Sequence, residues 1–140
     1  MSASKTFVDT NILVYAHDLD AGHKHEVALD ILIDLWHART GVLSTQVLQE
    51  FYITMTRKVS TPMTAAEARN VLRDYFTWHI EVNDTQSILM ASRIEEFHKI
   101  SFWDALIVAA AAKAKVMKIL TEDLSPGQLI EGIQIENPFL

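Results

Sequence analysis

The amino-acid sequence predicts an α/β domain in which helices cover both faces of a mainly parallel sheet. Short stretches rich in β-branched residues alternate along the chain with longer amphipathic stretches, which is typical of strands joined by crossover helices. The chain has 140 residues, 49% of them hydrophobic, with only four glycines and three prolines. This composition favours one compact domain over residues 1–140 and excludes a disordered chain. We expect a three-layer α/β/α sandwich with four to five strands.

The first half of the chain is predicted to hold two strands and three helices. Residues 5–8 form a strand, because they are apolar and β-branched, and residues 11–17 a short helix. Residues 41–43 form a second strand, and residues 44–58 a helix that begins with a capping serine. Between them, residues 23–39 form a longer helix with one apolar stripe: Ala28, Ile31, Leu32, Leu35 and Trp36.

The second half continues the same alternation. Thr64 and Glu67 have the spacing of a capping box, which predicts a helix that runs to Trp78. Asp84 and Ser101 are expected to cap two further helices. The remaining segments are predicted as strands at 79–82, 118–121 and 133–135, helices at 84–99 and 101–115, and a turn at 125–127.

Composition also bounds the function. No apolar stretch reaches the roughly 18 residues that a membrane span needs. Met1–Ser4 have no basic region followed by an apolar one, so we expect no secretion signal and a cytoplasmic protein. The absence of cysteine excludes disulfides and thiolate metal sites. The net charge of −6 argues at first against nucleic acid, because phosphate binding favours basic surfaces.

Four acidic side chains are predicted to meet at one edge of the sheet. A crossover helix runs antiparallel to the strands that it joins, so its N-terminus lies at the edge where the strands end. Asp9 closes the first strand, and Asp123 follows the fourth, with Glu122 beside it. Asp104 lies in the first turn of one helix and Glu50 in the second turn of another. We therefore expect these carboxylates to form one site.

Each of these acids also has a purely structural interpretation. Asp9 could cap the following helix, and Asp104 could complete a capping pattern with Ser101. Glu50 could be a solvated side chain, and Asp123 could begin a turn. However, the helix that carries Asp104 is apolar nearly all round, which predicts a buried helix and favours a role for its one acid. Convergence of all four at one edge favours a site.

Clustered carboxylates repel one another, and burying them unpaired is costly. The sequence places no lysine or arginine next to the four acids. Mg²⁺ or Mn²⁺, which prefer oxygen ligands and bind phosphate, would neutralise them. Such an ion lowers the pKa of a bound water and stabilises in-line displacement at phosphorus. The hydroxyl of Thr10 and the amide of Asn11 could orient the ligands or the water.

Four segments of the chain resemble the motifs of PIN domains, especially the VapC-type toxins of bacterial toxin–antitoxin pairs. The first and third motifs are fairly specific, and the order and spacing of all four agree over essentially the whole chain. The segments are residues 7–16 (FVDTNILVYA), 44–51 (STQVLQEF), 101–107 (SFWDALI) and 120–124 (LTEDL), the last followed by Gly127-Gln128 and Asn137-Pro138-Phe139.

The resemblance implies a metal-dependent endoribonuclease with Mg²⁺ or Mn²⁺ as cofactor and RNA as substrate. It also implies a cognate antitoxin, a small protein that lays a helix across an apolar groove, and a homodimer. Its acids would be Asp9, Glu50, Asp104 and a fourth, which the family pattern places at Asp123, with Glu122 as a neighbour that could substitute. Supporting residues would be Thr10, Asn11, Thr121 and Glu122.

The negative net charge does not contradict an RNA substrate. Setting aside the four proposed ligands leaves 14 of the 18 acidic residues against 12 basic ones. Basic side chains that could hold a phosphate backbone are Lys24, Arg39, Arg57, Lys58, Arg69 and Arg73. Aromatic side chains that could line the antitoxin groove are Trp36, Tyr52 and Trp103, each of which could equally belong to the core.

Two other functional classes remain open from the sequence. A phosphatase of the haloacid dehalogenase type also begins with an acid at a strand end, but its second acid falls two residues later. Here that position is Asn11, and no matching lysine motif follows. A binding module with the same fold and no activity is the other alternative. Cleavage of RNA that is sensitive to EDTA would separate an enzyme from a binder.

Overall fold

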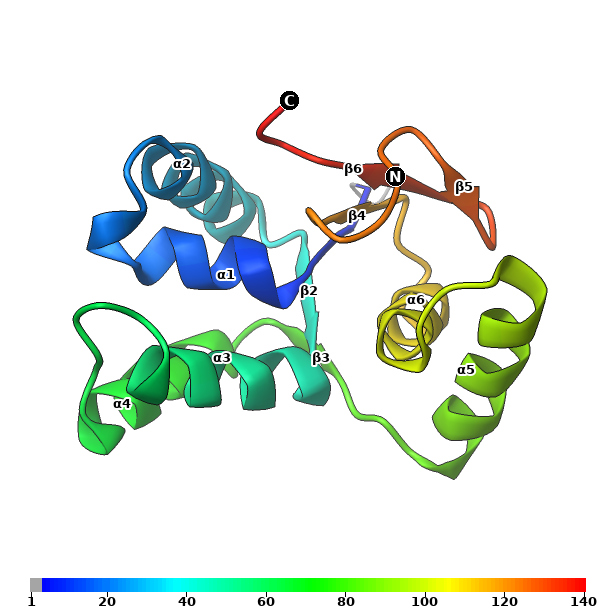
Figure 1. Cartoon of the computed structure of the whole chain (residues 1–140), viewed down its shortest axis with the longest axis horizontal. Helices are drawn as coiled ribbons and strands as arrows, with labels where there is room; N and C mark the ends of the chain where they lie inside the picture. Colours follow the sequence, from blue (N-terminus) through cyan, green and yellow to red (C-terminus); the bar gives the residue numbers. More distant parts are fainter. Residues whose placement is uncertain (1–3) are drawn as a thin grey trace.

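The structure is a computed structural model that describes residues 4–140. The expectation of no secretion signal concerns Met1–Ser4. Of these residues only Ser4 is described, so the expectation lies almost entirely outside the described residues. Figure 1 shows helices packed around a central sheet, with α1 to α4 on one side of the view and α5 and α6 on the other. No helix within residues 4–140 is long and apolar enough to cross a membrane.

Six strands form one sheet in the order β3-β2-β1-β4-β6-β5. All neighbouring strands run parallel except β5 and β6. This confirms the predicted α/β class with a mainly parallel sheet. The bounds are β1 (Thr6–Val8), β2 (Gly41–Ser44), β3 (His79–Glu81), β4 (Lys118–Leu120), β5 (Leu129–Ile130) and β6 (Ile133–Glu136).

The sheet has one strand more than the four to five expected. β5 is a two-residue strand that pairs antiparallel with β6. Between them Glu131 and Gly132 both have positive φ, at 51° and 76°. Two consecutive residues of that conformation form the tight turn of a hairpin. Two residues are too few to show the alternating pattern of a strand, so the sequence did not reveal β5.

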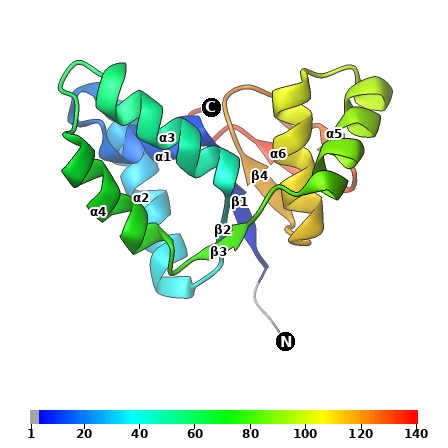
Figure 2. The same cartoon turned by 90° about the horizontal axis from the view of Figure 1, so that it is seen from below.

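The helices form two layers, one on each face of the sheet. Figure 2 shows α1 to α4 on one side of the strands and α5 and α6 on the other. This arrangement confirms the three-layer sandwich. The bounds are α1 (Thr10–His17), α2 (His23–Ala38), α3 (Thr45–Arg57), α4 (Ala65–Tyr75), α5 (Thr85–His98) and α6 (Phe102–Lys113), with a 3₁₀ turn at Leu19–Ala21.

The helix starts agree with the capping residues identified in the sequence. The Thr64 hydroxyl accepts a hydrogen bond from the Glu67 amide at 3.1 Å, and the Glu67 carboxylate accepts one from the Thr64 amide at 3.2 Å. Asp84 caps α5 and Ser101 caps α6. These bonds satisfy amide groups that have no partner within the helix. Each predicted cap therefore lies directly before an observed helix.

The helix α4 ends three residues earlier than predicted. The Thr77 hydroxyl donates to the carbonyl oxygen of Asp74 at 2.8 Å, and the Trp78 amide donates to Tyr75 at 2.9 Å. These bonds tighten the chain into a turn, and Trp78 then leads into β3. The apolar helix α6 is buried from Ala105 to Ala111, as its composition predicts.

A glycine on β2 lies where the ring of Trp78 covers the strand. A Cβ atom added at Gly41 would overlap the six-membered ring of Trp78. We predict that Gly41→Ala lowers the free energy of unfolding by about 1–3 kcal/mol, because an inserted methyl group displaces packed neighbours. Urea denaturation measures the change. The penalty should shrink in a Trp78→Ala background, and an equal penalty in both backgrounds would contradict steric overlap as the cause.

Candidate functional site: an acidic edge of the sheet

Asp9 lies at the carboxyl end of β1 and is held by two hydrogen bonds. β1 pairs in parallel with β4, so the residues that follow each strand lie side by side. The Thr121 hydroxyl donates to Asp9 Oδ2 at 2.7 Å, and the Thr10 amide donates to Asp9 Oδ1 at 2.7 Å. Asp9 is only 4% exposed and is also the N-cap of α1. The structural interpretation of Asp9 as a helix cap is therefore confirmed, and it leaves the carboxylate at the edge where a site was predicted.

Asp123 is connected to Asp9 through Thr121. The Asp123 amide donates to the Thr121 hydroxyl at 3.0 Å, and that hydroxyl in turn donates to Asp9. Asp123 is exposed, and it borders a cavity of about 300 Å³. The other lining residues come from the helices α1 and α3: Thr10, Asn11, Val14, Tyr15 and Thr54.

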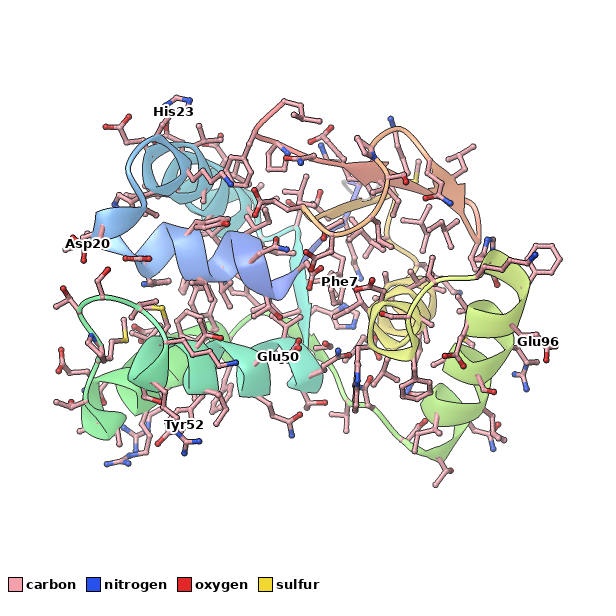
Figure 3. All side chains as sticks on the ribbon, in the orientation of Figure 1. Phe7, Asp20, His23, Glu50, Tyr52 and Glu96 are labelled. Carbon is pink, nitrogen blue, oxygen red and sulfur yellow. The ribbon has the colours of Figure 1, made fainter. Side chains whose placement is uncertain are left out.

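Glu50 reaches the same edge from α3. The Thr10 hydroxyl donates to Glu50 Oε1 at 2.9 Å. Figure 3 shows Glu50 on the side of α3 that lies nearer α1. Thr10 thus contacts two of the proposed acids, with its amide on Asp9 and its hydroxyl on Glu50.

Asp104 enters from the first turn of α6. Its amide donates to the Ser101 hydroxyl at 3.1 Å, so the capping interaction is present. Burial raises the pKa of the Asp104 carboxyl, the hydrogen bond with Ser101 opposes the increase, and the charge of Asp123 adds to it. The start of α6 is tied to α3 by Gln46, whose side-chain amide donates to the Trp103 carbonyl oxygen at 3.2 Å.

Two of the other proposed acids act on Asp9 through their charges. Burial raises the pKa of Asp9 to about 7, although the hydrogen bonds from Thr121 and Thr10 oppose that change. The negative charges of Asp123 and Glu50 raise the pKa further. A carboxyl group in this setting binds a proton or a cation more readily than an exposed one.

Glu122 is bound by side chains other than the proposed ligands. The Tyr15 hydroxyl donates to Glu122 Oε1 at 2.6 Å, and Lys24 donates to Glu122 Oε2 at 2.5 Å. Burial alone would raise the pKa of Glu122, but the hydrogen bonds from Lys24 and Tyr15 outweigh it and lower the pKa. The charge of Asp123, by contrast, acts on both Asp9 and Asp104.

The donor set fits a hard divalent cation. None of the ion pairs found in residues 4–140 includes Asp9, Glu50, Asp104 or Asp123, so their charges have no basic partner there. Within the same residues, no three acidic or histidine side chains are already close enough to hold a metal by themselves. Mg²⁺ is commonly held by one or two carboxylates together with waters and substrate phosphates. Beside the acids, the buried Oδ1 of Asn11 has no hydrogen-bond partner.

The predicted aromatic residues do not share one groove. Tyr52 borders an apolar cavity of about 420 Å³ between α3 and α4, with Leu48, Leu72 and Phe76 among its neighbours. Trp36 packs against Tyr75 and Trp78 instead, and Trp103 is 64% exposed and stacks edge-on against Phe102. Trp36 also borders two other cavities, of about 510 and 230 Å³.

The contacts of Glu122 were not foreseen from the sequence. Lys24 and Tyr15 are 98 and 107 positions away from it along the chain. The sequence indicated Lys24 only as one of six basic residues that could hold phosphate, and it did not single out Tyr15. No local pattern marks a pair that only the packing of α1 and α2 against the segment after β4 brings together.

One family of known proteins matches the sequence of this chain. The sequence model of the PIN domain family matches residues 6–126. No functionally curated protein is significantly similar to this chain in sequence. The structure is similar to that of Mycobacterium tuberculosis VapC20, a toxin that cleaves the sarcin–ricin loop, with a TM-score of 0.64, 23% identity, and coverage of 82% of this chain and 87% of that one.

Two further solved structures have the same fold. A toxin–antitoxin complex from Klebsiella pneumoniae matches with a TM-score of 0.69, 19% identity, and coverage of 96% of this chain and 98% of that one. DNA-bound VapBC from Salmonella typhimurium matches with a TM-score of 0.65, 18% identity, and coverage of 97% and 99%.

In the metal-free protein, we predict that the raised pKa of Asp9 makes the domain less stable as the pH rises. The folded chain keeps the Asp9 proton up to about pH 7, whereas the unfolded chain releases it near 3.8. This contribution to stability is therefore complete below about pH 4 and is lost as the pH rises through about 7. A difference of roughly three pKa units corresponds to about 4 kcal/mol as an upper limit.

Asp9→Asn stays neutral and keeps an oxygen that accepts from the Thr10 amide. We expect the variant to be more stable than the wild type at pH 7 and equally stable near pH 4. Urea unfolding in EDTA between pH 4 and 8 gives the free energies. Parallel pH profiles for the two proteins would show that Asp9 titrates normally.

Proposed function

The chain belongs to the PIN domain family, and on that basis we propose that it is a metal-dependent endoribonuclease that acts as the toxin of a type II toxin–antitoxin pair. One observation supports the proposal: the charges of Asp123 and Glu50 act on Asp9 and that of Asp123 acts on Asp104, and none of these four acids forms an ion pair within residues 4–140. In parallel α/β sheets this is the edge where ligands bind. The family assignment favours this activity over that of a haloacid dehalogenase phosphatase.

Asp9, Glu50, Asp104 and Asp123 would hold Mg²⁺ or Mn²⁺. When bound, the ion supplies an activated water and neutralises charge on the phosphodiester. Thr10 and Thr121 each donate to one oxygen of Asp9 and so fix the orientation of its carboxylate. Thr10 also fixes Glu50.

The substrate would be single-stranded or looped RNA, whose phosphates and bases are accessible to such an edge. Support comes from VapC20, which cleaves the sarcin–ricin loop and shares this fold. The exposed side chains of Arg57, Lys58, Arg69 and Arg73 would contribute to phosphate binding, and Asn11 would line the site next to Asp123. Lys24 is engaged by Glu122 instead.

The inhibitor would be a cognate antitoxin with an apolar helix. Support comes from the similar toxin–antitoxin complexes of Klebsiella pneumoniae and Salmonella typhimurium. The apolar cavity beside Tyr52 is a surface of suitable chemistry, because few polar groups interrupt it. Following the family pattern, we also propose that the chain forms a homodimer and acts in the cytoplasm.

Asp9→Asn and Asp104→Asn are each expected to abolish cleavage of RNA in Mn²⁺ without unfolding the domain. The rate should fall at least 100-fold, since even the loss of a partner that orients a metal ligand costs about 10–100-fold. EDTA should abolish the wild-type activity in the same assay. Asp30→Asn, which removes an exposed acid on α2, is the matched control and should cleave normally.

Cleavage is measured by mapping new 5′ ends in total RNA, and folding by circular dichroism. Wild-type rates in both site variants would refute the assignment of the acids. RNA binding without cleavage by the wild type would favour a binding module instead.

Expression of the chain alone is expected to arrest growth, and Asp9→Asn should relieve the arrest. Affinity purification from the native host should recover a small basic protein in a stable complex, and light scattering on the purified chain should give the mass of a dimer. Cleavage of RNA with no such partner would contradict the toxin role and leave the nuclease role intact.

A further inference from the structure

Glu122 is the centre of a cluster that joins three parts of the chain. Its Oε1 accepts from the Tyr15 hydroxyl on α1 at 2.6 Å, and its Oε2 accepts from Lys24 on α2 at 2.5 Å. Both oxygens therefore have a donor. Two of the roughly four acceptor positions of the Glu122 carboxylate are thereby occupied.

Aromatic rings complete the cluster and hold Lys24 in place. The Lys24 ammonium lies 5.0 Å from the ring centre of Tyr15 and 5.4 Å from that of Phe139. The two rings meet edge to face at 5.4 Å. A cation between two aromatic faces is attracted to both. We call Tyr15, Lys24, Glu122 and Phe139 the Glu122 clamp.

The clamp holds the short segment that carries Asp123. On one side of Glu122, Thr121 donates to Asp9 and accepts from the Asp123 amide. On the other side, Asp123 borders the cavity that Tyr15 also lines. Thr121 is thus held by its hydrogen bond to Asp9, and Glu122 by its hydrogen bonds from Tyr15 and Lys24. Asp123, the next residue, stays near the other acids.

This attachment opposes a repulsive force. The charge of Asp123 acts on Asp9 and on Asp104, so a free segment would lower its energy by moving Asp123 away from them. Asp123 itself is exposed and has no basic partner among the ion pairs of residues 4–140. The clamp and the Thr121 hydroxyl hold the segment together with the Thr121 amide, which donates to the Glu136 carbonyl oxygen at 3.0 Å, and with Leu124, whose side chain is buried in the core.

We propose that Lys24 and Tyr15 are positioning residues that, through Glu122, hold Asp123 against the other three acids before a metal binds. The proposal rests on the proposed function, because it assigns these residues a task at the same site. The Lys24–Glu122 pair is partly exposed, at 43% and 21%, so it contributes little to folding stability. Its loss should weaken the site much more than the fold.

The test uses variants of the full chain that leave the net charge unchanged. Removing Lys24 alone would take away a positive charge and so strengthen the attraction of the site for any cation. That gain would mask weaker binding caused by a displaced Asp123. The double variant Lys24→Met/Glu122→Gln and the single variant Tyr15→Phe avoid this problem. The control is Lys113→Met/Asp84→Asn, which removes an ion pair of 3.2 Å with a lysine of similar exposure and a more exposed acid, and the asparagine can still cap α5.

The primary measurement is Mn²⁺ binding without RNA, by isothermal titration calorimetry. We expect about 10-fold weaker binding in Lys24→Met/Glu122→Gln and in Tyr15→Phe, in the range found when a group that orients metal ligands is lost. Lys24→Arg, which keeps a charged donor, should bind nearly as the wild type does, and the control pair should bind unchanged. Melting temperatures should stay close to that of the wild type.

A second measurement separates positioning from a direct role of Lys24 on RNA. Positioning predicts that the Mn²⁺ concentration for half-maximal cleavage rises, while the rate at saturating Mn²⁺ returns towards that of the wild type. A direct RNA contact predicts unchanged Mn²⁺ binding and a higher KM for RNA in the Lys24 variants. That second pattern would overturn the proposal.

The failure of this proposal differs from a failure of the proposed function. Wild-type Mn²⁺ affinity in both the double variant and Tyr15→Phe contradicts the positioning role alone. A wild-type chain that binds no Mn²⁺ and cleaves no RNA contradicts the proposed function and the positioning role together. If the double variant does not fold, Tyr15→Phe decides the question, because it removes one hydroxyl and keeps the ring.

Discussion

The burial of the Asp9 carboxylate among other acids is the constraint on which the rest of the site depends. Asp9 is 4% exposed, and its charge is opposed both by burial and by Asp123 and Glu50. Within residues 4–140, two hydrogen bonds, from Thr10 and Thr121, offset this cost. Asp9 in this arrangement strongly favours binding a proton or a cation. The proposed metal-binding role uses that preference.

The structural and functional roles of these acids are not alternatives. Asp9 caps α1 and faces the site, and Asp104 sits within the Ser101 cap of α6 while the charge of Asp123 acts on it. A helix N-terminus stabilises negative charge. Placing a carboxylate there therefore lowers the free-energy cost of keeping it close to other carboxylates. The caps therefore lower the cost of assembling the acidic edge.

Much of the fold was predictable because its signals are local. The capping residues Thr64, Asp84 and Ser101 marked helix starts, and the apolar composition of α6 indicated its burial. Alternation of strands and helices then placed the acids at one edge by topology alone. The strand β5 and the end of α4 were missed, because a two-residue strand and a turn made by the Thr77 hydroxyl leave no periodic pattern.

The sequence by itself determined the fold class and the family, and it proposed the four acids, since periodicity, caps and motifs are read from residues close together in the chain. The tertiary structure decided which side chains contact one another. It placed Asp123 beside Thr121 and Asp9 while turning the adjacent Glu122 towards Lys24 and Tyr15. Glu122 and Asp123 are both acidic and are adjacent in the chain. They differ because α1 and α2, folded over the end of β4, offer donors to one of them and not to the other.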